Sequence, residues 1–218
     1  MSGRRSTSRV RLFRYFAEQS SPRIMLVALV TLGGLRLYLG EGSAWDAFVA
    51  GAVVFLWPLN EWVLHVYVLH ARPIRMFGRT FEMKLLTGHG AHHLDPLAWK
   101  QSFIEPRALL VYIVINAAFL LLLLPSFALA LTGLCTAAVL GLVYEWTHFL
   151  IHTDYRPRTR AFKRLWVSHR LHHFKSEKYW FGVTMLSGDR LLGTQPDPSK
   201  VETSPTCRTL GRDAELVS

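Results

Sequence analysis

Histidine dominates the chemistry that this sequence can perform. All ten histidines of the chain fall in four short windows. The windows read HxxxxH, HxxHH, HxxxH and HxxHH, and they comprise His65, His70, His89, His92, His93, His148, His152, His169, His172 and His173. Because neutral imidazole is a common ligand of iron, zinc, copper and nickel, this clustering predicts that all ten are metal ligands.

The spacing inside the windows predicts how the imidazoles converge. Residues three and four positions apart share one face of a helix, so each HxxHH trio is expected to direct its side chains the same way. The pair His148 and His152 should do so too. His65 and His70 are five positions apart, roughly 140° on a regular helix. They can converge only if the helix is loosened between them, or if they bind different metal ions.

The sequence contains an internal repeat around these windows. A Glu-Trp pair at Glu61 precedes the HxxxxH window, another at Glu145 precedes the HxxxH window, and an HxxHH trio follows each. The chain therefore reads as two related halves with five histidines each, which suits two metal ions. Glu61, Glu145 and Asp154 are candidates for orienting histidine N–H groups around the ligands. The alternative for the two glutamates is a charge at a helix end.

Long apolar runs must position these residues. Half of the 218 residues are hydrophobic, and they gather in runs at 24–40, 44–70, 107–124 and 127–144. A spanning helix needs ~20 apolar residues, which these runs approach or exceed. We therefore expect an all-α integral membrane protein with four transmembrane helices in two hairpins. A cap of short helices would carry the HxxHH trios.

The distribution of charge predicts the topology. The formal net charge is +10, and the links near 41–46 and 125–126 contain no Lys or Arg. The positive-inside rule then places both termini and the histidine-bearing helix ends on the cytoplasmic side. Because topology accounts for the basic residues, no nucleic-acid partner is expected. The membrane would be the endoplasmic reticulum in a eukaryote and the plasma membrane in a bacterium.

Three segments follow from this layout. Residues 1–23 form a basic cytoplasmic tail, either an amphipathic helix on the membrane surface or a solvated tail. Residues 24–194 form the membrane domain that contains the histidines. Residues 195–218 are rich in Pro, Ser and Thr, a composition typical of disorder.

The order of the four windows on four spans resembles the fatty acid hydroxylase superfamily, which includes membrane di-iron fatty acid hydroxylases and sterol desaturases. The resemblance covers about residues 50–194 and rests on EWVLHVYVLH, GHGAHH, THFLIHTDY, HRLHHFKSEKYWFGVT and GDRLLGT. Carotenoid hydroxylases are also similar, but their third histidine pair is commonly one residue wider. Gly188 stands where family members often have Trp, so local packing should differ there.

The resemblance implies a centre of two Fe ions, or zinc as purified, that activates O2 and hydroxylates a fatty acyl chain, sterol or related lipid. Electrons would come from a separate carrier, cytochrome b5 or a ferredoxin with its reductase. No histidine pair remains for a fused cytochrome, and no GxGxxG follows a predicted strand. The alternatives are a lipid desaturase of the same superfamily, a carotenoid hydroxylase and, from another class, a non-catalytic zinc-binding membrane protein.

Overall fold

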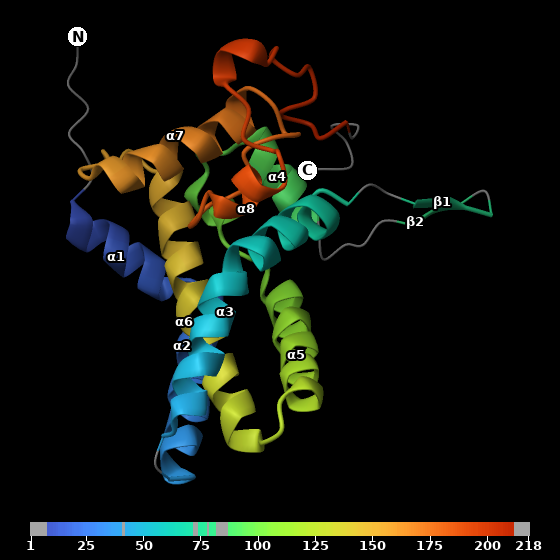
Figure 1. Cartoon of the computed structure of the whole chain (residues 1–218). Helices are drawn as coiled ribbons and strands as arrows, with labels where there is room; N and C mark the ends of the chain where they lie inside the picture. Colours follow the sequence, from blue (N-terminus) through green and yellow to red (C-terminus); the bar gives the residue numbers. More distant parts are fainter. Residues whose placement is uncertain (1–7, 41, 72–73, 78, 82–86, 212–218) are drawn as a thin grey trace.

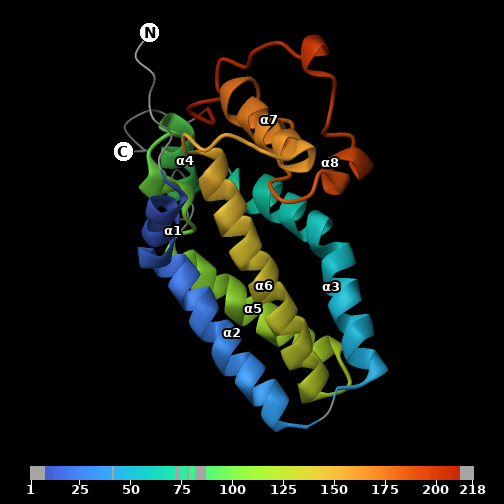
Figure 2. The same ribbon diagram turned by 90° about the vertical axis from the view of Figure 1, so that its left-hand side faces the viewer.

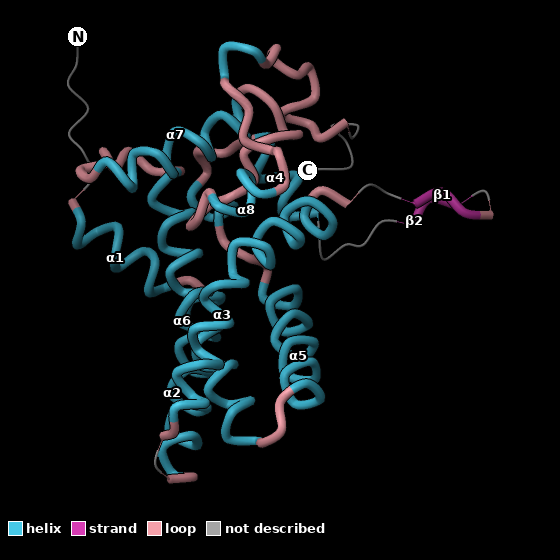
Figure 3. The backbone as a smooth tube through the Cα atoms, viewed as in Figure 1, coloured by secondary structure: helices cyan, strands magenta, loops and turns pink. Residues whose placement is uncertain are grey.

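The computed structural model describes residues 8–40, 42–71, 74–77, 79–81 and 87–211. In order, its elements are α1 (Arg9–Glu18), α2 (Ser20–Tyr38), α3 (Ala44–Val63), a π-helical turn (Leu64–Leu69), β1 (Ile74–Met76), β2 (Arg79–Phe81), α4 (Thr87–Leu94), a 3-10 turn (Trp99–Ser102), α5 (Pro106–Leu123), α6 (Phe127–Ile151), α7 (Arg160–Phe174), α8 (Ser187–Leu191) and a second 3-10 turn (Pro198–Lys200). The all-α prediction is confirmed, with one short antiparallel hairpin, β1–β2, added to it (Figures 1 and 3).

Four helical segments are long and apolar enough to cross a membrane: Ser20–Tyr38, Ala44–Leu69, Trp99–Leu123 and Phe127–Ile151. They form a bundle in which α6 packs against α2, α3 and α5. Helices α4, α7 and α8 lie together at one end of this bundle and form the cap (Figure 2). The expected four spans in two hairpins are confirmed, and the histidine-bearing helix ends all lie beneath the cap.

The described part of the N-terminal segment packs against the bundle. Helix α1 buries Leu12 and Phe16 in a cluster with Phe149 of α6. The ring of Tyr15 also stacks on that of Phe149, with centroids 5.7 Å apart. A solvated tail is therefore the wrong interpretation for residues 9–18. The expected domain boundary after residue 23 falls inside α2.

The C-terminal segment is also ordered where the structure describes it. The Ser204 N–H donates to the Lys175 carbonyl at 2.7 Å, and Cys207 and Leu210 are buried. The prediction of disorder is therefore wrong for residues 195–211. Composition alone is misleading here because backbone hydrogen bonds and two buried apolar side chains fix the segment. Residues 212–218 lie outside the described part of the chain.

Gly188 explains how α8 docks on α3. A Cβ atom at this position would lie 2.4 Å from the carbonyl oxygen of Pro58. Only a residue without a side chain permits this approach. The local packing thus requires glycine here, and it brings Asp189 next to the segment 181–184. Asp189 accepts hydrogen bonds from the backbone N–H groups of Phe181 and Gly182 at 3.0 and 2.7 Å.

Candidate metal centre

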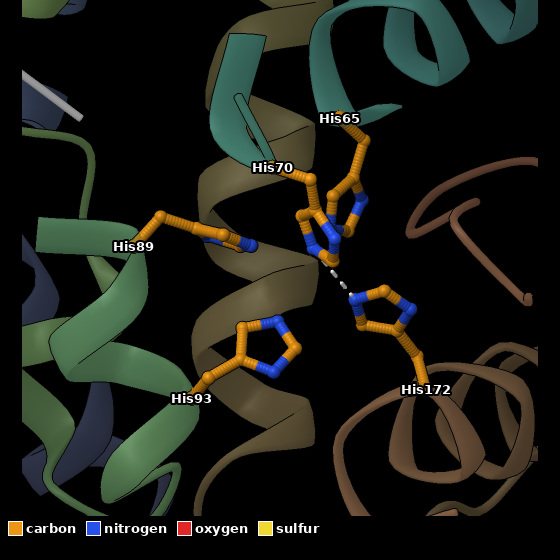
Figure 4. Close-up of side chains that lie close together, drawn as sticks. All are labelled: His65, His70, His89, His93 and His172. Carbon is orange, nitrogen blue, oxygen red and sulfur yellow. Dashed lines mark hydrogen bonds between the residues drawn. The ribbon is translucent and has the colours of Figure 1, made fainter. Parts of the chain in front are cut away.

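The ten histidines converge into two groups beneath the cap. The first group contains His65, His70, His89, His93 and His172 (Figure 4). The second group contains His92, His148, His152, His169 and His173. Within each group, one ligand nitrogen per residue lies within 4.8 Å of all the others. Each group therefore presents five imidazoles to one point in space.

A π-helical turn brings His65 and His70 together. The His70 N–H donates to the carbonyl of His65 at 3.1 Å, the i→i+5 bond that defines such a turn. The wider turn reduces the angle between two residues five positions apart, and the two ring centroids lie 5.0 Å apart. The helix is thus loosened between them, which is the first of the two alternatives expected from their spacing.

The two groups are not the two halves of the sequence. The middle histidine of each HxxHH trio belongs to the group formed mainly by the other half of the sequence. His92 of the first half lies in the second group, and His172 of the second half lies in the first group. The expectation that each trio points one way is therefore wrong. Consecutive residues are about 100° apart on a helix, so His92 and His93 diverge while His89 and His93 share a face. The same arithmetic separates His172 from His173.

Burial keeps these imidazoles neutral. His93, His169 and His173 have no exposed surface. Burial lowers the pKa of His93 to about 3, and it lowers the pKa of His169 and His173 well below the usual range. A neutral imidazole keeps a free lone pair, which is the form that binds a metal.

The nitrogen positions fit a metal ion in each group. The Nε2 atoms of His65, His89 and His93 are buried and have no hydrogen-bond partner among the described residues. Buried polar atoms rarely lack a partner, and these unpartnered nitrogens suit a bound metal ion. Imidazole nitrogens bind such ions at about 2.0–2.1 Å, which places nitrogens on one ion about 3 to 4 Å apart.

The observed separations match that requirement. The Nε2 atoms of His70 and His172 lie 3.2 Å apart in the first group. In the second group, the Nε2 atoms of His169 and His173 lie 3.0 Å apart. At such a distance one hydrogen bond can join only two neutral imidazoles. A metal ion could instead bind all five nitrogens of a group.

Backbone carbonyls orient four of the histidines. The Nδ1 atom of each lies 2.7 to 2.8 Å from a carbonyl oxygen, in the pairs His65–Phe181, His93–Cys207, His148–Ser102 and His172–Tyr179. Each contact places the proton on Nδ1 and leaves Nε2 free to face the group. Sequence reasoning missed these partners, because any residue type supplies a carbonyl.

The two glutamates act on the histidines through backbone segments that lie between them. Glu61 accepts from the backbone N–H groups of Val183 and Thr184 at 2.5 and 2.8 Å, two and three residues beyond the carbonyl that holds His65. Glu145 accepts from the Ile104 N–H at 2.9 Å, two residues beyond the carbonyl that holds His148. The expected direct contact with histidine is not what these bonds show: each glutamate fixes the segment whose carbonyl does the orienting.

Asp154, the third acidic candidate, is exposed just after the C-terminal end of α6. The histidines of both groups are more buried than this residue. Its role around the metal site stays a prediction.

An apolar cavity of about 120 Å³ borders the first group. His65, Leu64 and Leu109 line it, together with Trp57 and Tyr112. Trp57 and Tyr112 also line a groove of about 460 Å³ between α3 and α5. The first group therefore adjoins an apolar space that leads toward the surface of the spanning bundle.

Comparison with known proteins agrees with this architecture. Residues 50–194 match the family model described as fatty acid hydroxylase. The chain is 32% identical over 148 residues to a dihydroceramide fatty acyl 2-hydroxylase of Arabidopsis thaliana, covering 66% of this chain and 58% of that protein. It is 28% identical over 175 residues to a ceramide very long chain fatty acid hydroxylase of Schizosaccharomyces pombe, covering 79% of this chain and 49% of that protein.

A solved structure, full-length scs7p with only the hydroxylase domain visible, has the same fold. The TM-score is 0.69 at 22% identity, covering 84% of this chain and 68% of that chain. The family model matches well over half of the residues, and the chain therefore belongs to the fatty acid hydroxylase family. It spans about half the length of the curated relatives described above.

Proposed function

We propose that this protein is a membrane-bound, non-haem di-iron oxygenase that hydroxylates the fatty acyl chain of a ceramide-type lipid. One observation carries the proposal: ten histidines, eight of them buried, form two five-nitrogen groups, the first of which borders an apolar cavity. The names of the Arabidopsis and Schizosaccharomyces pombe relatives support the acyl chain of a ceramide-type lipid as substrate. The name of the Arabidopsis relative supports the second carbon as the position attacked.

The two histidine groups would each hold one iron ion. Such ions supply the O2 activation needed to attack an unactivated C–H bond. Ten neutral ligands leave the metal charge uncompensated, so small anionic ligands from solvent are expected beside them. The chain itself contributes the fixed geometry, the exclusion of bulk water by burial, and neutral imidazoles. Glu61 and Glu145 hold the segments that orient His65 and His148.

The substrate would enter from the bilayer. The groove between α3 and α5 is apolar and leads to the cavity that touches His65. At their junction the Asn60 side-chain amide donates to the Tyr112 hydroxyl at 3.0 Å, a polar contact that bridges the two helices. An acyl chain lying past this contact would keep its tail among lipid-like side chains while its carbonyl end stays near the metal group.

Electrons would reach the site from the cytoplasmic side. Hydroxylation of a C–H bond by O2 consumes two electrons and two protons and forms one water, so a reductant must be supplied. We assign this role to a separate carrier, cytochrome b5 or a ferredoxin with its reductase. The four basic residues Arg160, Lys163, Arg164 and Arg190 line a hollow of about 420 Å³ on the cap, where an acidic carrier would be attracted.

The test is to purify the protein in detergent, measure bound metal, and supply reduced protein with O2 and a ceramide. We expect about two irons per chain, one for each group, and a product heavier by one oxygen at the second acyl carbon. A product lighter by two hydrogens would identify a desaturase, and oxidation of a carotenoid or a sterol instead of ceramide would change the substrate class. Stoichiometric zinc without lipid oxidation, even after iron reconstitution, would identify a non-catalytic zinc protein.

A further inference from the structure

The last described residues of the chain lie across the cap, beside α4 (Figures 1 and 2). They fall outside residues 50–194, the part that matches the family model. We name residues 204–208 the C-terminal clamp. Its contacts reach two helices that carry histidines, although nothing in its composition indicates a role in the site.

One side of the clamp holds the C-terminal end of α4. The Cys207 carbonyl lies 2.8 Å from Nδ1 of His93. The Arg208 guanidinium donates to the carbonyl of His93 at 2.8 Å and also to the carbonyl of Leu94. The last carbonyls of a helix have no partner within the helix, and a cation there complements the helix dipole. The clamp thus satisfies the end of α4 and orients one of its histidines.

The other side of the clamp is anchored to the segment that follows α7. The Ser204 N–H donates to the Lys175 carbonyl at 2.7 Å. The Thr206 hydroxyl donates to the Glu177 carboxylate at 2.6 Å. The Arg208 guanidinium also lies over the ring of Phe174, 5.4 Å from its centroid. These contacts tie the end of α4 to the end of α7.

Helix α4 needs such support. It has eight residues, and isolated helices shorter than about 12 residues are unstable in water. It nevertheless contributes His89 and His93 to the first group and His92 to the second. Its packing within the described part of the chain is chiefly against the 3-10 turn Trp99–Ser102. A loosened α4 would therefore displace ligands of both groups together.

We propose that the C-terminal clamp, through Arg208 and the Cys207 carbonyl, is the positioning element that fixes α4 within the cap. The effect on metal binding rests on the proposed function, whereas the effect on α4 itself does not. Arg208 touches no reacting atom in this scheme, so it acts only through the position of His93 and its neighbours.

The experiment compares two truncations and two point variants. A chain ending at residue 203 lacks the clamp, and a chain ending at residue 211 keeps it and serves as the control. Arg208→Gln removes the charged donor, and Arg158→Gln changes an exposed arginine elsewhere. Hydrogen exchange of residues 88–94 is measured in metal-free protein, and bound iron is measured after reconstitution.

We expect amides of residues 88–94 to exchange at least ~10-fold faster in Arg208→Gln, because hydrogen bonds to a charged group are lost. The chain ending at residue 203 should show a larger change, and both controls should match the full chain. Reconstituted iron should fall in both clamp variants. Unchanged exchange in Arg208→Gln and in the chain ending at residue 203 would overturn the proposal. If the full chain binds no metal, the proposed function fails, while hydrogen exchange still decides the role of the clamp.

Discussion

The two histidine groups have the same ligand set but different surroundings. All five residues of the second group are buried, whereas His70 and His89 of the first are partly exposed. The second group rests mainly on the regular helices α6 and α7, and the first includes a π-helical turn. The apolar cavity of about 120 Å³ touches the first group through His65. The difference indicates that the second group is the more rigid and that, in the proposed function, the first is the one open to exchange and substrate.

The largest expected effect comes from removing a crossed-over histidine. His172→Ala should empty the first group and His92→Ala the second, each leaving one iron per chain. Because O2 activation needs both ions in this proposal, lipid hydroxylation should fall more than ~100-fold in either variant. Metal analysis and product mass spectrometry on the same samples check this. Retention of both ions in both variants would contradict the assignment of ligands.

A chelator should remove the ions of the two groups at different times. A chelator is expected to extract the first-group ion before the second, because only the first group has partly exposed ligands. An ion present at a free concentration of about 100 times its Kd stabilises the fold by about 2.7 kcal/mol. The Tm should therefore fall in two stages as the two ions are removed. Native mass spectrometry during chelation measures the order. Simultaneous loss of both ions would mean that the difference in exposure does not govern release.

The glutamates should divide their effects between the groups. Glu61→Ala removes the acceptor of the Val183 and Thr184 N–H groups, so the first group should bind metal about 10- to 100-fold more weakly. Glu145→Ala should weaken the second group by about 10-fold, since one backbone N–H loses its acceptor. Titration with iron under reducing conditions measures both affinities. Glu18→Ala, an exposed control, should leave both unchanged.

The smallest expected effect is at Gly188. The Cβ of Gly188→Ala would press on the Pro58 carbonyl and displace α8, which should cost about 1–3 kcal/mol of stability. Only the first group should respond, because Asp189 holds the segment whose Phe181 carbonyl orients His65. Denaturant unfolding and metal affinity together check this. Gly51→Ala is the matched control, since a Cβ there meets nothing within 4 Å.

Much of this architecture could be predicted from sequence, because long apolar runs and histidine spacing are strong signals. The length of the apolar runs predicts the spans, and helix periodicity predicts the conditional loosening between His65 and His70. The crossing of His92 and His172 also follows from this periodicity, because adjacent histidines in a trio lie about 100° apart although each shares a face with the first histidine. The carbonyls of Phe181 and Ser102 were not predictable, because their contacts depend on tertiary folding and not on residue type.

For the C-terminal segment, the sequence predicts disorder and the structure shows an ordered chain at residues 195–211. Its composition is typical of disorder, yet a few backbone hydrogen bonds and the side chain of Arg208 fix it against α4. Composition averages over a segment, whereas order here depends on single contacts. A low hydrophobicity is therefore weak evidence of disorder when a folded surface with unsatisfied helix carbonyls lies nearby.

The crossing of the two trios sets the order in which the site can be completed during synthesis. The contact between His70 and His172 spans 102 residues, so the first group lacks a ligand until α7 has been made. His173, the next residue, completes the second group. The last ligands of the two groups are therefore added by consecutive elongation steps, after all four spans have been synthesised. In the proposed two-ion site, stable loading of either ion must therefore follow synthesis of α7, because a chain that ends before residue 172 lacks a ligand in each group.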